Sequence, residues 1–127
     1  MQERLLVAVD GSAHSDKIIR EACQRTKKLS TKIMLLYVSK FADLAATSKL
    51  AGMIQTEQIS CEVVFQTGNL TEKVMTTAPK RRASMIILGL MSFNGFGKIG
   101  SHLSVARSAI KNASCPVLVI GGEEGER

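Results

Sequence analysis

The stretch from Met85 to Ile120 limits the possible folds most strongly. It opens with a short apolar run, Met85–Leu88, that stops at Gly89, and it closes with a second such run, Pro116–Ile120. A short apolar run rich in β-branched residues is typical of a strand buried on both faces of a parallel sheet. Between the two runs lie a glycine-containing loop and a helical pattern. The stretch therefore predicts a strand, a loop, a helix and a second strand.

The loop after Gly89 contains the parts of a phosphate cradle. Its glycines, Gly100 among them, let the backbone approach a ligand or take a positive φ. Ser101 or Ser104 would cap the following helix, whose free N–H groups and positive dipole end attract an anion. The alternative is a tight turn that holds no ligand.

The chain before Met85 repeats the alternation of strands and helices. Apolar runs at Leu5–Val9 and Ile33–Val38 predict two central strands, and the less apolar Glu62–Gln66 predicts a strand nearer an edge. Strands that alternate with helices form a parallel sheet with helices on both faces and right-handed crossovers. The sequence therefore predicts a five-stranded α/β domain, and in the strand order 3-2-1-4-5 the first and fourth strands are neighbours.

Helical spacing marks the connections between these strands. The predicted buried positions of the first helix are Ile18, Ile19, Ala22, Cys23 and Thr26. Those of the second are Leu44, Ala45, Ser48, Ala51 and Ile54 or Gln55. Those of the third are Val74, Met75 and Ala78, with Asn69 as N-cap, Glu72 as its acidic partner and Pro79 at the end. Those of the last are Val105, Ala106, Ala109, Ile110 and Ala113.

Asp10 and Gly89 would share one edge of this sheet. Each follows an apolar run, and open α/β sheets bind ligands at the carboxyl ends of the strands, where the chain reverses direction. The neighbouring first and fourth strands place both residues beside one crevice. Two interpretations of Asp10 are equally supported: it contacts a ligand, or it only caps a helix or stabilises a turn.

Composition excludes several classes of protein. Hydrophobic residues are 45% and charged residues 22% of the 127, which is the range of a globular chain. We expect one domain over residues 1–122, a flexible tail over 123–127, and neither a signal peptide nor a membrane span. Three scattered cysteines favour small buried side chains in a reducing, cytoplasmic compartment. The net charge of +6 permits nucleic-acid binding, but few aromatic residues are present to stack bases, so Lys80–Arg82 is interpreted as a solvated helix end.

Other catalytic and cofactor motifs are incomplete. The residues around Lys98 fail the Walker A pattern, because Ser92 stands where a glycine is required. The segment Gly95–Gly100 fits a dinucleotide glycine pattern but begins too far beyond the fourth strand. The sequence has two histidines and no evident acidic partner for either, so it does not support a hydrolytic triad or a metal centre. No catalytic nucleophile is identified, and a weak ATPase would need a metal site that the sequence does not show.

The layout resembles the universal stress protein family over essentially the whole chain. The segments that carry the resemblance are Leu6–Ser12, Leu35–Val38, Gly68, Met85–Gly89, Ser104–Val105 and Pro116–Ile120. The resemblance implies a Rossmann-like sheet, related to the adenine nucleotide alpha hydrolases, in the order 3-2-1-4-5. It also implies a homodimer that often pairs the last strands, and in many members a bound ATP or AMP.

The resemblance implies site residues in two halves. Asp10 matches the acidic residue near the adenine and ribose, and Val38 matches the position whose backbone touches the adenine. Gly89 matches the first glycine of the motif G-x2-G-x9-G-S/T, whereas Ser92 stands at the second glycine. The nucleoside half thus matches, and the phosphate half departs from the family.

The end of the phosphate motif aligns in two ways. Aligned from Pro116, Ser104 takes the serine place and Leu103 the last glycine place, with one residue too many in the loop. Aligned on Gly100 and Ser101, both residues match but the loop is two residues short. Lys98 or Arg107 would neutralise phosphate charge.

The resemblance predicts a stress-response protein that binds an adenine nucleotide, with Gly89, Ser92, Gly100, Ser101 and Ser104 around the phosphates. The alternative is a nucleotide-free member that acts as a protein-interaction module.

Overall fold

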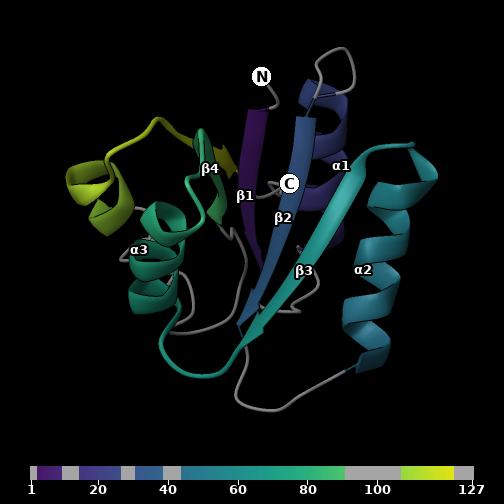
Figure 1. Cartoon of the computed structure of the whole chain (residues 1–127), viewed down its shortest axis with the longest axis horizontal. Helices are drawn as coiled ribbons and strands as arrows, with labels where there is room; N and C mark the ends of the chain where they lie inside the picture. The colour runs from purple at the N-terminus through teal and green to yellow at the C-terminus, as the bar shows by residue number, and fades with distance from the viewer. Residues whose placement is uncertain (1–2, 10–14, 27–30, 39–43, 91–106, 122–127) are drawn as a thin grey trace.

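Five parallel strands form one sheet in the computed structural model, which describes residues 3–9, 15–26, 31–38, 44–90 and 107–121 (Figure 1). The strand order is β3-β2-β1-β4-β5, as predicted. The strands are β1 (Glu3–Val9), β2 (Thr31–Val38), β3 (Ser60–Gln66), β4 (Met85–Leu90) and β5 (Val117–Gly121).

Helices cover both faces of the sheet, which confirms the predicted α/β class. On one face lie α1 (Ser15–Thr26) and α2 (Leu44–Thr56). On the other lie α3 (Leu70–Lys80) and the helical residues 107–112, drawn in yellow-green in Figure 1. The fold is therefore doubly wound, with the sheet between two helical layers.

Alternate residues of each strand enter the two cores, because successive side chains point to opposite faces. In β1, Leu5, Val7 and Val9 pack on the α1 and α2 side. Leu6 and Ala8 pack on the α3 side. Both sets are buried, which explains why the central strands are continuous apolar runs.

The strand boundaries differ from the predicted ones at both ends. β1, β2 and β3 each begin two residues earlier, at Glu3, Thr31 and Ser60, because polar first residues do not extend an apolar pattern. β4 continues through Gly89 to Leu90, so Gly89 lies inside the strand and pairs with Ile120. Gly89 does not have a positive φ, so its backbone continues the parallel hydrogen-bond pairing with β5 and does not end the strand.

Helix α1 has the buried residues that the sequence predicted. Ile18, Ile19, Ala22, Cys23 and Thr26 are all buried. The Thr26 hydroxyl donates to the Ala22 carbonyl at 2.9 Å, so this buried polar group is satisfied within the last turn.

The predicted stripe of α2 is partly wrong. Thr47, Leu50, Ala51 and Ile54 are buried, whereas Ala45, Ser48 and Gln55 are exposed. Small and apolar residues occur all round this helix, so periodicity alone did not define its phase. Contact with α1 and β3 decides which side is buried.

Helix α3 has the predicted ends. The Asn69 side chain accepts a hydrogen bond from the Glu72 backbone N–H at 2.9 Å, as an N-cap does. Pro79 is the penultimate residue, and the helix ends at Lys80. Val74 and Ala78 are buried as predicted, and Met75 is half-buried.

In the last helical segment, Ala109 is buried and Ala113 is half-buried, as predicted, but Ile110 is 63% exposed. The predicted positions Val105 and Ala106 lie outside the described residues.

Candidate functional site

The carboxyl edge of the sheet has the geometry of a ligand crevice. β1 lies between β2 and β4, and all three strands are parallel. From β1 the chain proceeds outward to β2 and β3, and then returns to the other side of β1 as β4. The carboxyl ends of β1 and β4 therefore lie side by side at the point where the chain reverses direction, which is where crevices open in such folds.

Val38 stands at this edge as the last residue of β2. Its side chain is 3% exposed and packs in the core on the α3 side. Because the side chain is occupied by the core, only the backbone of Val38 is available to a ligand. The backbone contact with adenine that the family resemblance implies stays a prediction.

Gly89 also lies near this edge, but its missing side chain serves a helix. A Cβ built on Gly89 would lie 2.2 Å from Cδ1 and 2.7 Å from Cγ1 of Ile18, in α1. Gly89 does not have a positive φ. A left-handed backbone is therefore not the reason for a glycine here, whereas close packing of α1 on β4 is one, and approach of a ligand to the Gly89 backbone stays a prediction.

The remaining predicted site residues lie outside the described part of the chain. They are Asp10, Ser92, Gly100, Ser101 and Ser104, together with Lys98, and Leu103 of the loop. Arg107 is described, and its exposed side chain is at the start of the helical residues 107–112. The structure thus brings together the strand ends that precede Asp10 and Ser92, and leaves the side chains of these residues as predictions.

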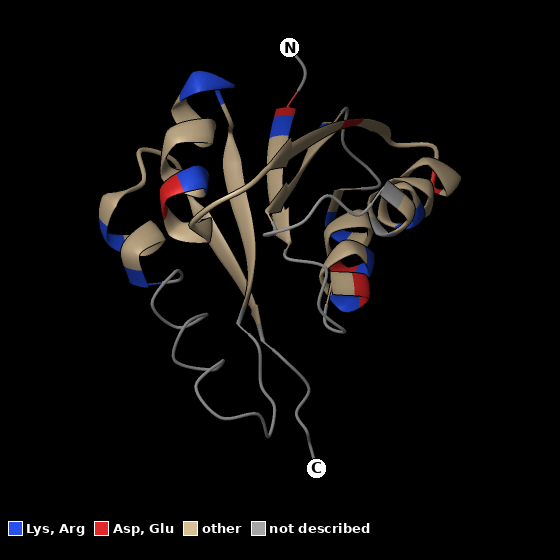
Figure 2. Cartoon of the chain, turned by 90° about the horizontal axis from the view of Figure 1, so that it is seen from below, with Lys and Arg blue, Asp and Glu red and all other residues tan. Residues whose placement is uncertain are grey.

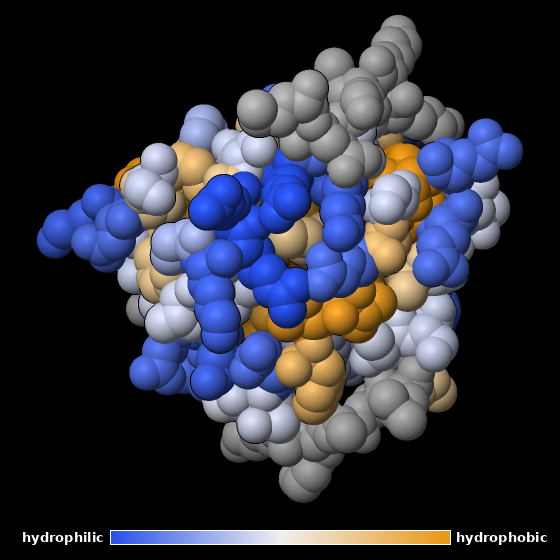
Figure 3. All heavy atoms as spheres, viewed as in Figure 1, coloured by the Kyte–Doolittle hydropathy of each residue, from blue (hydrophilic) through white to orange (hydrophobic). Residues whose placement is uncertain are grey.

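Charged side chains are distributed over several elements. Figure 2 shows Lys and Arg on the helices and near strand ends, with no single basic face in the view drawn. Figure 3 shows hydrophilic residues gathered near the middle of one side of the molecule, next to apolar ones.

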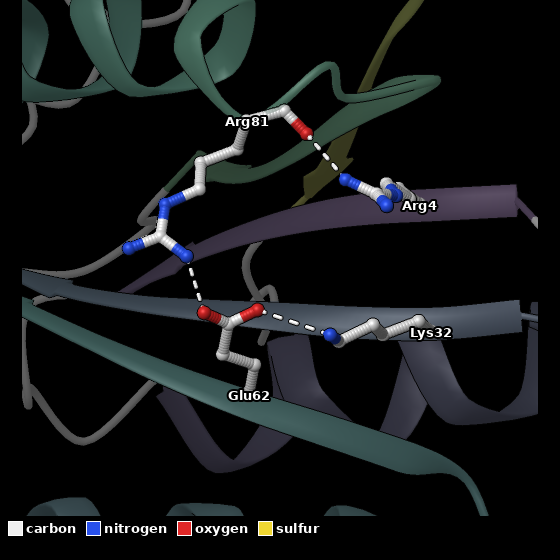
Figure 4. A network of polar contacts seen from close by, with 4 residues as sticks. All are labelled: Arg4, Lys32, Glu62 and Arg81. Carbon is white, nitrogen blue, oxygen red and sulfur yellow. Dashed lines mark hydrogen bonds and ion pairs between the residues drawn. The ribbon is translucent and has the colours of Figure 1, made fainter.

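A network of polar contacts on the α3 face was missed by the sequence analysis (Figure 4). The Glu62 carboxylate pairs with the Lys32 ammonium at 3.1 Å and with the Arg81 guanidinium. The Arg4 guanidinium donates to the Arg81 carbonyl at 3.3 Å. Arg81 is therefore not a solvated helix end, as predicted for Lys80–Arg82, although Lys80 and Arg82 are exposed. Nineteen residues separate Glu62 from Arg81, and no sequence pattern links them.

The network changes the acidity of Glu62. Hydrogen bonds from Lys32, and then from Arg81, hold the pKa of the Glu62 carboxyl below its ordinary value. Such a group stabilises the fold fully above its unfolded-state pKa of about 4.3, and this contribution is lost as the pH falls through the lower folded-state pKa.

We expect Glu62→Gln to lower the free energy of unfolding at pH 7 by about 0.5–1 kcal/mol, since partly exposed ion pairs are weak. The side chains of Glu62 and Lys32 are 35% and 31% exposed. Urea unfolding at pH 7, 5 and 3 measures the effect, and the difference from the parent should shrink at pH 3. Glu21→Gln, in a 3.9 Å surface pair with Arg25, is the matched control and should change less. A loss that is the same at every pH would contradict the assignment to the Glu62 charge.

The cysteines and acidic residues of the described part do not form a metal centre. No group of three or more His, Cys, Asp or Glu side chains there is close enough to hold an ion. Cys23 is buried, Cys61 and Cys115 are half-buried, and none of the three forms a disulfide. Burial raises the pKa of the Cys61 thiol to about 11, so it stays protonated at neutral pH. In the same part of the chain, none of the helices has the length and apolarity that a membrane crossing requires.

A doubly wound parallel sheet in this strand order defines a Rossmann-like α/β domain. The sequence model of the universal stress protein family matches residues 1–62. The chain is 21% identical over 149 aligned positions to universal stress protein YxiE of Bacillus subtilis, across 94% of this chain and 99% of that protein. The chain is thus similar to universal stress proteins, by the family model over residues 1–62 and by this relative over nearly its whole length.

Solved structures share the fold at low identity. One is a universal stress protein family protein from Arabidopsis thaliana with AMP bound, with a TM-score of 0.72 and 18% identity over 98% of this chain and 94% of that one. Another is the universal stress protein from Archaeoglobus fulgidus in complex with dAMP, with a TM-score of 0.72 and 19% identity over 93% of this chain and 97% of that one.

Proposed function

We propose that this chain binds an adenine nucleotide at the carboxyl edge of the sheet, between β1 and β4, and acts as a dimeric regulatory module in a stress response. The observation that carries the proposal is the strand order, in which the chain reverses direction between these two strands. Two proteins of the same fold were solved with AMP and with dAMP, which supports adenine as the base.

The nucleoside half of the proposed site comes from β1 and β2. Asp10 directly follows β1, and its carboxylate would accept hydrogen bonds from the ribose or the adenine. Val38 ends β2, the neighbouring strand, and would offer its backbone to the base. Burial of the Val38 side chain does not prevent these contacts, because the proposed contact of Val38 uses only its backbone.

The phosphate half would come from the segment after β4. Ser92, Gly100, Ser101 and Ser104 would line the phosphates, and Lys98 or Arg107 would balance their charge. Gly89 would contribute only its backbone, because the space of its side chain is filled by Ile18. Since this half departs from the family motif, we expect a single phosphate to be held better than three, and thus AMP at least as tightly as ATP.

Calorimetry with AMP, ADP and ATP tests this proposal. Heat from a saturable site with millimolar or tighter affinity is the expected result, with AMP at least equal to ATP. A mass spectrum of small molecules released from the denatured purified protein provides an independent measurement. No heat at millimolar nucleotide and no nucleotide released would overturn the proposal.

The second candidate function is a nucleotide-free module that binds other proteins. It is favoured by Leu103, which stands at a glycine place of the family motif in one alignment and would crowd a phosphate. We expect Leu103→Gly to strengthen ATP binding more than AMP binding if the parent already binds AMP. If the parent binds neither nucleotide and Leu103→Gly creates binding, the nucleotide-free function is the correct one.

The homodimer and the cytoplasmic location are also proposals. β5 is at the end of the strand order and pairs with β4, so its other edge can accept a second copy. The three thiols, none of which forms a disulfide, support a reducing compartment. Sedimentation of the purified protein tests the dimer, and a concentration-independent monomer would contradict it.

A further inference from the structure

A cavity of about 550 Å³ lies at the amino end of the sheet, opposite the proposed nucleotide edge. It is on the α1 face, beneath the last turn of α1. Its apolar lining includes Leu5 of β1, Met85 and Ile87 of β4, and Leu118 of β5. Pockets of about 300–1,000 Å³ that are lined mainly by apolar side chains are typical of small-molecule sites.

Three hydroxyl side chains of the described residues line this cavity, and they differ in their hydrogen bonds. The Thr26 hydroxyl donates to the Ala22 carbonyl, and the Ser84 hydroxyl accepts from the Arg4 backbone N–H at 3.1 Å. The Thr31 hydroxyl is buried and has no hydrogen-bond partner in the described structure. Buried polar groups in native proteins nearly always have a partner, so an unpaired one indicates a missing group.

The position of Thr31 connects this unpaired hydroxyl to the cavity. Thr31 is the first residue of β2 and is 6% exposed. It alternates with Ile33 and Leu35, which face the same core as Leu5 and Ile87. Its side chain therefore lies on the cavity side of the sheet, among the lining residues.

The charges around the cavity indicate an uncharged ligand. Among the described residues that line the cavity, only Glu3 and Arg25 are charged, and they have opposite signs. The Arg25 guanidinium is already paired with Glu21 at 3.9 Å. A charged ligand would have to leave water for apolar walls without a dedicated partner of opposite charge, which is costly.

We propose that this cavity is a second binding site, for a small, uncharged, mainly apolar molecule with one hydrogen-bonding group that pairs with the Thr31 hydroxyl. The size of the cavity admits a molecule of about two fused rings, because a cavity of about 150 Å³ already holds benzene. The site does not share residues with the proposed nucleotide edge, so it does not depend on nucleotide binding.

Methyl NMR with 2-naphthol as the probe tests the site, and naphthalene, which lacks the hydroxyl, is the matched probe. We expect saturable shifts at the methyl groups of Leu5, Met85, Ile87 and Leu118. The methyl groups of Ile19 and Met53, which line a separate groove between α1 and α2, should stay unchanged. The same shifts should occur with and without 1 mM AMP.

Thr31→Val removes the hydroxyl at nearly constant shape. We expect the affinity for 2-naphthol to fall about three- to tenfold, as for loss of one neutral hydrogen bond, while that for naphthalene stays the same. Equal effects on both probes, or shifts spread over both sets of methyl groups, would overturn the proposal. Shifts of the Leu5 and Met85 methyl groups on dilution of the protein alone would also overturn it, because a second copy would then cover the cavity, whereas a shift of Leu118 alone is expected if β5 pairs with a second copy.

Discussion

Replacing Asp10 with alanine is expected to lower the affinity for AMP about 10- to 100-fold, because hydrogen bonds to a charged group are the strong ones. Asp10 follows directly after β1, at the strand end that borders the crevice beside β4. Its carboxylate would accept hydrogen bonds from the hydroxyl or amino groups of the nucleoside. Calorimetric titration of the parent and the variant with AMP measures the change.

Two further variants distinguish the site from a general effect of charge. Asp16→Ala removes the same charge from the first turn of α1, where Asp16 pairs with Lys49 at 3.3 Å, and should change the AMP affinity less than twofold. Asp10→Asn keeps an acceptor but loses the charge, and should fall between the parent and Asp10→Ala. Equal AMP affinity in the parent and a folded Asp10→Ala variant would exclude Asp10 from the site.

Gly89→Ala is expected to lower the free energy of unfolding by about 1–2 kcal/mol. Overpacking of a well-packed site costs about 1–3 kcal/mol, whereas the gain from a less flexible unfolded chain is only about 0.4–1 kcal/mol. The new Cβ would lie 2.2 Å from Ile18 Cδ1, so the Ile18 side chain or α1 must move. Urea unfolding of the parent and the variant measures the difference.

A double-mutant cycle with Ile18→Ala tests this cause. Ile18→Ala alone removes a buried side chain and should cost about 2–5 kcal/mol. In that background Gly89→Ala should be neutral or stabilising, because the two atoms that it would meet are gone. Gly52→Ala is the matched control, since a Cβ there meets no atom within 4 Å and the substitution in α2 should stabilise by about 0.5–1 kcal/mol. Additive effects of Gly89→Ala and Ile18→Ala would contradict the packing role of Gly89.

Gly89 illustrates the difference between a motif and its physical reason. From the sequence, a glycine after an apolar run indicated a phosphate loop. In the structure the glycine is inside β4, and α1 packs against it. The two roles are compatible, because the contact with Ile18 occupies only the side-chain space of Gly89. Only the packing role follows from the contacts of the described residues.

The sequence by itself determined the class of fold. Continuous apolar runs separated by helical spacing are readable because burial on both faces leaves no polar positions in the central strands, as in Leu5–Val9. Local hydrogen bonds were equally readable, since Asn69 and Glu72 are three residues apart. The phase of α2 was not, because its residues are similar all round the helix.

Only the tertiary structure decided which distant residues meet. No spacing in the chain encodes that Ile18 packs against Gly89 or that Arg81 pairs with Glu62. The same holds for Thr31 and Leu118, which line one cavity from two separate strands. Local patterns record how each element is buried, whereas the order of the strands determines what each side chain is buried against. For this protein the local sequence patterns defined the fold. The order of the strands revealed the packing role of Gly89, the polar network around Glu62 and the cavity at the amino end of the sheet.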